Sequence, residues 1–138
     1  MDYNYQKGAT NCWGTPDGIL ERFAEYFDPC PFRPQFDGLA VDWKGNTFVN
    51  PPFSNMKRWA DKAFAEYQKD PSRNIVFLMP SDRLNRKYLE KWWGHCSMTL
   101  VKGTVRFKPL LGQSARLGFH LPVVLLTLGR TGFDVIDV

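Results

Sequence analysis

The residues Asn50-Pro51-Pro52-Phe53 place an amide, a proline carbonyl and a flat aromatic ring next to one another. The two prolines fix two φ angles and hold Asn50 extended, so its side chain is presented rigidly. An amide oxygen beside a proline carbonyl offers two acceptors, which suit an amino group with two N–H donors. Phe53 adds a flat face for a planar ring. The pattern indicates binding of a planar amino compound, and the alternative is an ordinary proline-rich turn.

Strands and helices predicted around this motif would position it. Because the motif follows the apolar run 47–49, we predict a strand that ends in a loop at Asn50. An amphipathic helix is predicted after it, as far as Gln68. The continuous apolar run 75–79 is typical of a strand buried on both faces, and a second helix is expected at 85–93. Two successive strand-then-helix units predict a right-handed crossover and a parallel sheet.

Three further apolar segments follow with no helix between them, so we expect an antiparallel hairpin at the edge of the sheet. They are Thr99–Val101, Gly103–Phe107 and Pro122–Leu128. The expected fold class is therefore α/β, a reduced Rossmann-like sandwich with a mostly parallel sheet and an antiparallel C-terminal hairpin. Residues 1–138 are predicted to form a single domain, with the polar residues 1–12 as a flexible arm.

Two segments before the motif have the chemistry of ligand sites. Thr15 can cap a helix that begins at Pro16, and the N–H groups of such a helix start suit a carboxylate, although an ordinary N-cap is the alternative. Residues 26–31 are predicted to form a short buried strand with Asp28 at its C-terminal edge, where ligands bind in open α/β sheets. Asp28 could hold an ammonium group or ribose hydroxyls, or could be a surface acid ahead of a proline turn.

Composition limits the classes of function. The formal net charge of +4 permits nucleic-acid binding without requiring it. Cys12, Cys30 and Cys96 lack paired CxxC spacing, so neither a disulfide framework nor a metal site is expected. No long apolar run indicates a membrane span or a signal peptide, so we expect a soluble, intracellular protein.

The order of these segments resembles the phage-type family of DNA N6-adenine methyltransferases, small Dam-like enzymes that use S-adenosylmethionine. The resemblance covers most of the chain. The segments that carry it are Trp13–Pro16, Phe27–Cys30, Asp37–Leu39 with Trp43, Phe48–Ser54, Val76–Pro80, Lys102–Phe107 and Pro122–Leu126. It implies an adenine-specific, site-specific DNA methyltransferase of the cytoplasm, with a phage or a virus among its expected sources.

The resemblance also implies roles for individual residues. Asn50 and the Pro51 carbonyl would accept hydrogen bonds from the adenine amino group. Pro52 completes the catalytic motif, and Phe53 would stack on a base flipped out of a DNA duplex. The implied cofactor-binding residues are Trp13, Thr15, Pro16, Asp28, Asp37 and Phe48. Among them, Thr15 and Pro16 would meet the carboxylate of S-adenosylmethionine, and Asp37 would meet its adenine.

DNA recognition would fall to basic side chains that follow the two predicted strands, and a solvated helix face is the alternative for them. They are Lys57, Arg58, Arg83, Arg86 and Lys87. The same two acceptors would also suit cytosine N4, RNA or a protein glutamine. Because the segment between Asp28 and Asn50 is short, the second and third strands of the usual methyltransferase sheet are missing or reduced. A nucleic-acid-binding relative without methyl transfer is the remaining alternative.

Overall fold

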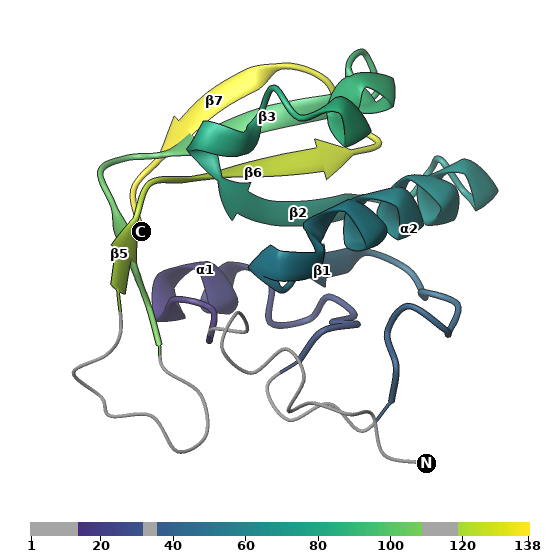
Figure 1. Cartoon of the computed structure of the whole chain (residues 1–138), viewed down its shortest axis with the longest axis horizontal. Coiled ribbons are helices and arrows are strands. Elements are labelled where there is room, and N and C mark those ends of the chain that lie inside the picture. Colours follow the sequence, from purple (N-terminus) through teal and green to yellow (C-terminus); the bar gives the residue numbers. More distant parts are fainter. Residues whose placement is uncertain (1–13, 32–35, 109–118) are drawn as a thin grey trace.

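Five strands form the central β-sheet of the protein, which the computed structural model describes over residues 14–31, 36–108 and 119–138 (Figure 1). The strands, in their order across the sheet, are β1 (Thr47–Val49), β2 (Ile75–Pro80), β6 (Val123–Leu128), β3 (Cys96–Val101) and β7 (Phe133–Ile136). A second sheet pairs β4 (Val105–Phe107) with β5 (Phe119–Leu121). The sequence predicted every one of these strands except β5 and β7.

The helical segments are short, with one exception. They are α1 (Asp17–Arg22), α2 (Met56–Lys69) and the 3-10 helices η2 (Phe53–Asn55), η3 (Ser81–Arg83) and η4 (Lys87–Trp92). The predicted helix after the Asn50 motif is confirmed as α2, whereas η4 replaces the second predicted helix. Within the described ranges, no helix combines the length and the apolar character needed to cross a lipid bilayer.

The strand β6 lies in the middle of the sheet, between β2 and β3, and runs antiparallel to both. Every residue of β2 is buried, and so are all but one in β6. Strands that are covered on both faces need apolar side chains at consecutive positions, which explains the unbroken apolar runs of the sequence. In the register, Val76 pairs with Thr127 and Met79 pairs with Val124.

The predicted reduced Rossmann-like sandwich with a mostly parallel sheet is wrong. The pairs β1–β2 and β3–β7 are parallel, but β2–β6 and β3–β6 are antiparallel. In the described chain only α2 is long enough to connect two adjacent parallel strands, because residues 81–92 form 3-10 turns instead of a second crossover helix. The predicted edge hairpin is also wrong: β6 is apolar on both faces and is therefore buried in the centre of the sheet.

Different elements cover the two faces of the sheet. On one face, Trp59 of α2 and Trp92 of η4 are fully buried. On the other face, Ile19 of α1 packs with Phe48 of β1 and Phe107 of β4. Complete burial of an aliphatic or phenyl side chain of this kind contributes about 1.5–3 kcal/mol. The short α1 and β4 therefore take the place of a second helical layer.

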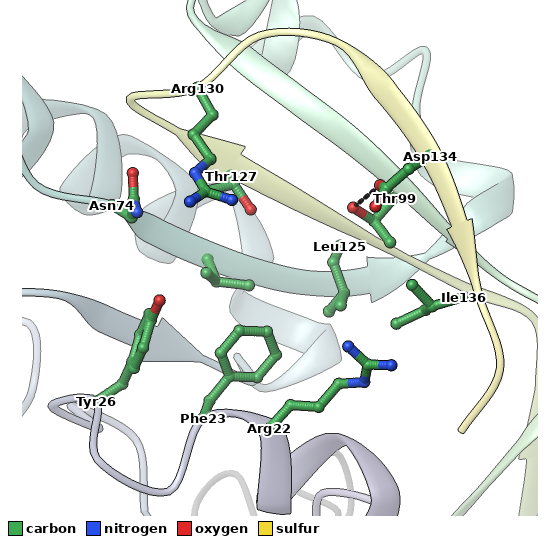
Figure 2. Close-up of a pocket in the computed structure, with 11 residues that line it drawn as sticks. Arg22, Phe23, Tyr26, Asn74, Thr99, Leu125, Thr127, Arg130, Asp134 and Ile136 are labelled. Carbon is green, nitrogen blue, oxygen red and sulfur yellow. Dashed lines mark hydrogen bonds between the residues drawn. The ribbon is translucent and has the colours of Figure 1, made fainter.

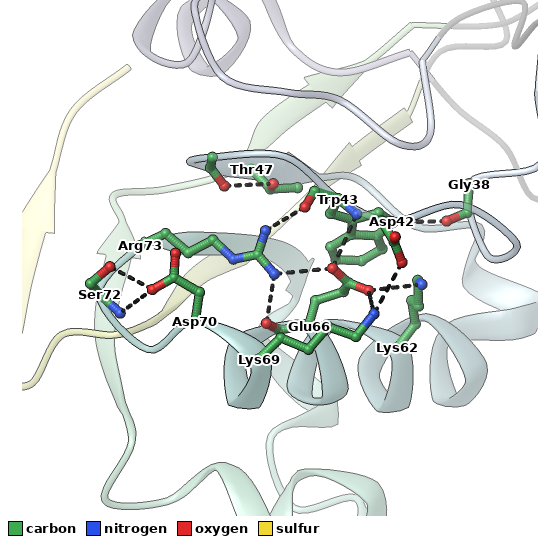
Figure 3. A network of polar contacts seen from close by, with 11 residues as sticks. Gly38, Asp42, Trp43, Thr47, Lys62, Glu66, Lys69, Asp70, Ser72 and Arg73 are labelled. Carbon is green, nitrogen blue, oxygen red and sulfur yellow. Dashed lines mark hydrogen bonds and ion pairs between the residues drawn. The ribbon is translucent and has the colours of Figure 1, made fainter.

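A loop without regular secondary structure, residues 37–43, is attached to α2 through Trp43. The indole Nε1 of Trp43 donates a hydrogen bond to the Gly38 carbonyl at 2.8 Å. Its ring stacks against Trp59, with 6.3 Å between the ring centroids. The Trp43 backbone N–H donates to the Glu66 carboxylate at 3.0 Å, so the loop is held by both apolar and polar contacts (Figure 3).

The Glu66 carboxylate is 1% exposed and lies at the centre of a polar network (Figure 3). Arg73 donates to the Glu66 carboxylate at 3.0 Å and to the Trp43 carbonyl at 2.5 Å. Lys62 and Lys69 donate to the second carboxylate oxygen at 3.0 and 2.8 Å. A buried charge is tolerated only when it is paired and hydrogen-bonded, and both conditions are met here.

The network determines the pKa of Glu66. Burial by itself would raise this pKa, but hydrogen bonds from Lys69, Lys62, the Trp43 backbone and Arg73 outweigh burial and lower the pKa from 4.5 to about 2. Because the folded pKa lies below the unfolded one, ionised Glu66 stabilises the protein above pH 4.5. That contribution is lost as the pH falls from 4.5 to about 2.

We predict that Glu66→Gln lowers the free energy of unfolding by about 3 kcal/mol at pH 7, because it leaves Arg73 buried without its counter-charge. Urea unfolding monitored by tryptophan fluorescence measures the loss. The matched control is Glu90→Gln, which changes an exposed glutamate. Between pH 4.5 and 2 the stability of the wild type should also fall more steeply than that of Glu66→Gln. Equal stabilities for the two variants at pH 7 would contradict the prediction.

Candidate functional site

The strand β1 positions Asn50, which follows its last residue. Phe27 forms a parallel bridge with Thr47, and the Phe48 N–H donates to the Phe27 carbonyl at 2.9 Å. The segment predicted to be a strand at 26–31 is thus reduced to a single bridge. It still brings Asp28 alongside β1, on the side of β1 that β2 leaves open.

The side chain of Asn50 is held by a residue from the N-terminal part of the chain. Its Nδ2 donates a hydrogen bond to the Thr15 hydroxyl at 3.0 Å, which fixes the orientation of the amide and turns its carbonyl oxygen away from Thr15. Thr15 is not the helix cap that the sequence predicted. The helix α1 begins at Asp17, Pro16 is its N-cap, and no side chain caps it.

A second pairing holds Thr15 in place. Gly14 and Lys108 exchange two backbone hydrogen bonds, at 2.7 and 3.0 Å. The Lys108 side chain also forms an ion pair with Asp17, at the start of α1. The chain on both sides of Thr15 is therefore fixed to the segment that follows β4, and the position of Asn50 depends on this attachment.

Phe53 is half-buried and is held by Arg83. The Arg83 guanidinium donates to the Phe53 carbonyl at 3.1 Å and lies 5.6 Å from the centre of the Phe53 ring, in the range of a cation–π contact. Phe107 meets the same ring edge-on, with 5.7 Å between the centroids. Arg83 therefore contacts the motif itself, a role that the sequence reading missed.

Asp28 is a partly buried carboxylate. Burial raises its pKa to about 6, although the hydrogen bond that it accepts from the Cys30 N–H, at 2.9 Å, acts in the opposite direction. Within the part of the chain that the structure describes, Asp28 forms no ion pair. A carboxylate in this setting suits a ligand that brings hydroxyl or ammonium donors.

The structure brings Asp37 into the neighbourhood of Asp28. A Cβ added to Gly38 would lie 1.9 Å from the Pro29 carbonyl oxygen and 2.7 Å from the Trp59 ring. The two backbone segments therefore touch at Gly38, where a larger residue would not fit. Asp37 is exposed and accepts the Leu39 N–H at 3.0 Å, so its carboxylate lies at the surface, on the segment that contacts Pro29.

The remaining predicted cofactor residues are placed differently. Phe48 is 2% exposed and stacks on Phe23 at 4.9 Å, so it is part of the core on the α1 face. Pro16 is buried next to Thr15. Trp13 lies outside the described residues. No group of three or more metal-binding side chains is found within the described ranges.

The predicted DNA-binding side chains follow the C-terminal ends of β1 and β2, which are parallel neighbours. Lys57 and Arg58 are exposed in the first turn of α2, and Arg86 and Lys87 are exposed at the start of η4. Lys57 forms an ion pair with Asp61 at 2.8 Å. These four side chains lie near the C-terminal ends of β1 and β2, as Asn50 does. The guanidinium of Arg83 instead contacts Phe53.

The contacts that hold the motif join residues far apart in the chain. Thr15 is 35 positions from Asn50, and Arg83 is 30 positions from Phe53. Nothing in the local sequence around any of these residues indicates its partner.

The chain matches no protein-family model, no curated protein and no solved structure in comparisons with known proteins.

We predict that Asp28→Asn stabilises the protein at pH 8, because it removes a buried charge and keeps the acceptor for the Cys30 N–H. The folded pKa of about 6 lies above the ordinary value of 3.8, so ionisation of Asp28 reduces stability as the pH rises from 3.8 through 6. The expected gain is about 3 kcal/mol at pH 8 and close to zero at pH 3. Urea unfolding at the two pH values measures it, and a gain that is the same at both would contradict the prediction.

Proposed function

We propose that the protein is an S-adenosylmethionine-dependent methyltransferase that acts on the exocyclic amino group of adenine in DNA. The observation that carries the proposal is the Asn50 amide, which Thr15 holds in a fixed orientation beyond the end of β1. Pro51 follows it immediately. The Pro51 backbone carbonyl and the side-chain carbonyl oxygen of Asn50 are the two acceptors that an amino group with two N–H donors needs.

In this proposal, Asn50 and Pro51 accept the two amino hydrogens and direct the nitrogen lone pair toward the methyl donor. S-adenosylmethionine supplies, when bound, an electrophilic methyl group on a sulfonium. Asn50 and Pro51 need only position the amino nitrogen, and such positioning can offset about 7 to 11 kcal/mol of the barrier. As the new N–C bond formed, the methyl–sulfur bond would break with its electron pair left on sulfur, S-adenosylhomocysteine would be the leaving group, and the amino nitrogen would give one proton to solvent.

The carboxylates next to β1 support the cofactor part of the proposal. Asp28 is partly buried without a cationic partner in the described chain, which fits donors such as ribose hydroxyls or an ammonium group. Asp37 lies on the adjacent segment, at the surface. We therefore expect both residues to contact S-adenosylmethionine. Phe48 and Pro16 would then support this site from the core and not touch the cofactor.

Phe53 supports the choice of a planar substrate. Arg83 and Phe107 fix its ring at a half-buried position, so the ring is ready to stack without first being ordered. Arg58, Arg86 and Lys87 are exposed near the C-terminal ends of β1 and β2 and provide positive charge for the phosphates of DNA. An adenine flipped out of a DNA duplex would stack on Phe53.

We predict that Asn50→Ala lowers methyl transfer to adenine-containing DNA by about 10²- to 10³-fold, as expected for loss of a preorganised polar group. Transfer of a labelled methyl group from S-adenosylmethionine measures the rate, and mass spectrometry of the digested nucleosides identifies the product. The matched control, Gln68→Ala, removes an exposed amide from α2 and should keep full activity.

The same assay tests the acceptor. N4-methylcytosine, methylated RNA or a methylated glutamine peptide as the product would replace adenine with that acceptor. Calorimetric titration of S-adenosylmethionine into the wild type, Asp28→Ala and Asp37→Ala tests the cofactor site independently. If the folded protein binds DNA but shows neither S-adenosylmethionine binding nor methyl transfer, the proposal fails in favour of a binding protein.

We predict that Arg58→Gln and Arg86→Gln each weaken DNA binding and each reduce the slope of log K against log salt concentration by about one. Fluorescence anisotropy with a labelled duplex at several salt concentrations measures both quantities. Lys44→Gln is the control, because it removes one exposed positive charge ahead of β1, at the end of the strand away from Asn50. An equal effect from Lys44→Gln would indicate a general effect of net charge.

A further inference from the structure

A pocket of about 170 Å³ lies on the face of the sheet opposite α2 (Figure 2). It exists because α1 is only six residues long and covers only part of this face. Val76 of β2 and Leu125 of β6 line its floor, and Phe23 and Tyr26 line the side formed by the chain after α1. The apolar floor is continuous with the core on this face.

Two arginines from different elements line the same pocket. Arg22 is the last residue of α1, and Arg130 follows β6 (Figure 2). Among the residues that the structure describes, neither guanidinium has a hydrogen-bond or ion-pair partner. The one acid in the lining, Asp134, accepts a hydrogen bond from the Thr99 hydroxyl. Two positive charges and one negative charge leave the pocket with a positive charge.

The other polar groups of the lining complement an oxyanion. Asn74 and Thr127 bring an amide and a hydroxyl to the side of Arg130, and Tyr26 has a phenol on the facing wall (Figure 2). Guanidinium groups bind phosphate oxygens in a bidentate manner, and amide and hydroxyl groups add further donors. These groups surround an apolar floor, so the pocket suits a molecule with a charged end and an apolar part.

The pocket is separate from the Asn50 site. Thr15, which binds Asn50, precedes α1, whereas Arg22 ends it, and six helical residues span roughly 9 Å. The two sites also lie toward opposite ends of β2, because Asn74 precedes that strand and Arg83 follows it. A ligand here would therefore leave the amino-group acceptors untouched.

We propose that this pocket binds a small phosphorylated molecule, held between Arg130 on one side of the pocket and Arg22 on the other, with its apolar part against Phe23 and Leu125. The phosphate of a free metabolite and the phosphate of a nucleic-acid backbone share this chemistry. The aromatic wall and the apolar floor favour the free molecule, since a backbone phosphate would have to enter with its neighbouring nucleotides outside.

The test is titration of the full chain with inorganic phosphate, adenosine monophosphate and a short DNA duplex, followed by calorimetry and by NMR shifts of the Asn74 and Thr127 amides. Arg22→Gln and Arg130→Gln should each weaken phosphate binding by about tenfold, the effect of losing one charge-assisted contact. Adenosine monophosphate should bind more tightly than phosphate, because it also fills the apolar floor. The control is Lys91→Gln, which removes one charge from η4 on the opposite face of the sheet.

Three results would overturn the proposal. The first is that neither phosphate nor adenosine monophosphate shifts the two amides. The second is that Lys91→Gln weakens binding as much as the arginine variants, which would indicate a general effect of charge. The third is that only the duplex loses affinity in Arg22→Gln and Arg130→Gln, which would assign the pocket to the DNA backbone. None of these results depends on methyl transfer, so the pocket can fail while the proposed function stands.

Discussion

The buried Glu66 carboxylate is the interaction on which the arrangement of the Asn50 side of the sheet depends. It accepts hydrogen bonds from three parts of the chain: α2 itself, the loop that ends at Trp43, and Arg73 just before β2. Because a charge in this position must keep its partners, these three parts cannot move independently. The loop carries Gly38 against the Pro29 carbonyl, and so the Glu66 carboxylate also helps to fix the contact between the segment of Asp37 and the segment of Asp28.

Local patterns were enough to predict most of the elements but not how they pair. The apolar runs at β1, β2 and β6 and the amphipathic stripe of α2 report burial directly, and these elements formed where the sequence placed them. Strand direction is not encoded in such runs, because a strand buried on both faces has the same pattern beside parallel or antiparallel neighbours. The prediction that β6 lies at the edge of the sheet was therefore wrong, and β7, which is largely exposed, has no such apolar run to reveal it.

The candidate site was predictable to the same extent. Asn50-Pro51-Pro52-Phe53 and Asp28 could be selected because their chemistry is local, and the structure does place both beside β1. What orients them is not local. Thr15 and Arg83 were selected for other roles, a helix cap and a phosphate contact, and both instead touch the motif. When a side chain could serve several roles, its tertiary contacts decide which role it has, and residue type and spacing do not specify those contacts.

The central place of β6 has a consequence for how the protein is made. On the ribosome, β1, α2, β2 and β3 are all synthesised before residues 123–128. Until β6 emerges, β1 and β2 can form one parallel pair, whereas β3 lacks both of its neighbours in the central sheet because β7 follows β6 in the chain. The edges of β2 and β3 that β6 will occupy stay open. Open apolar edges are templates for pairing between chains. The nascent chain should therefore be most prone to aggregate, and most dependent on chaperones, during the interval between completion of β3 and release of β6.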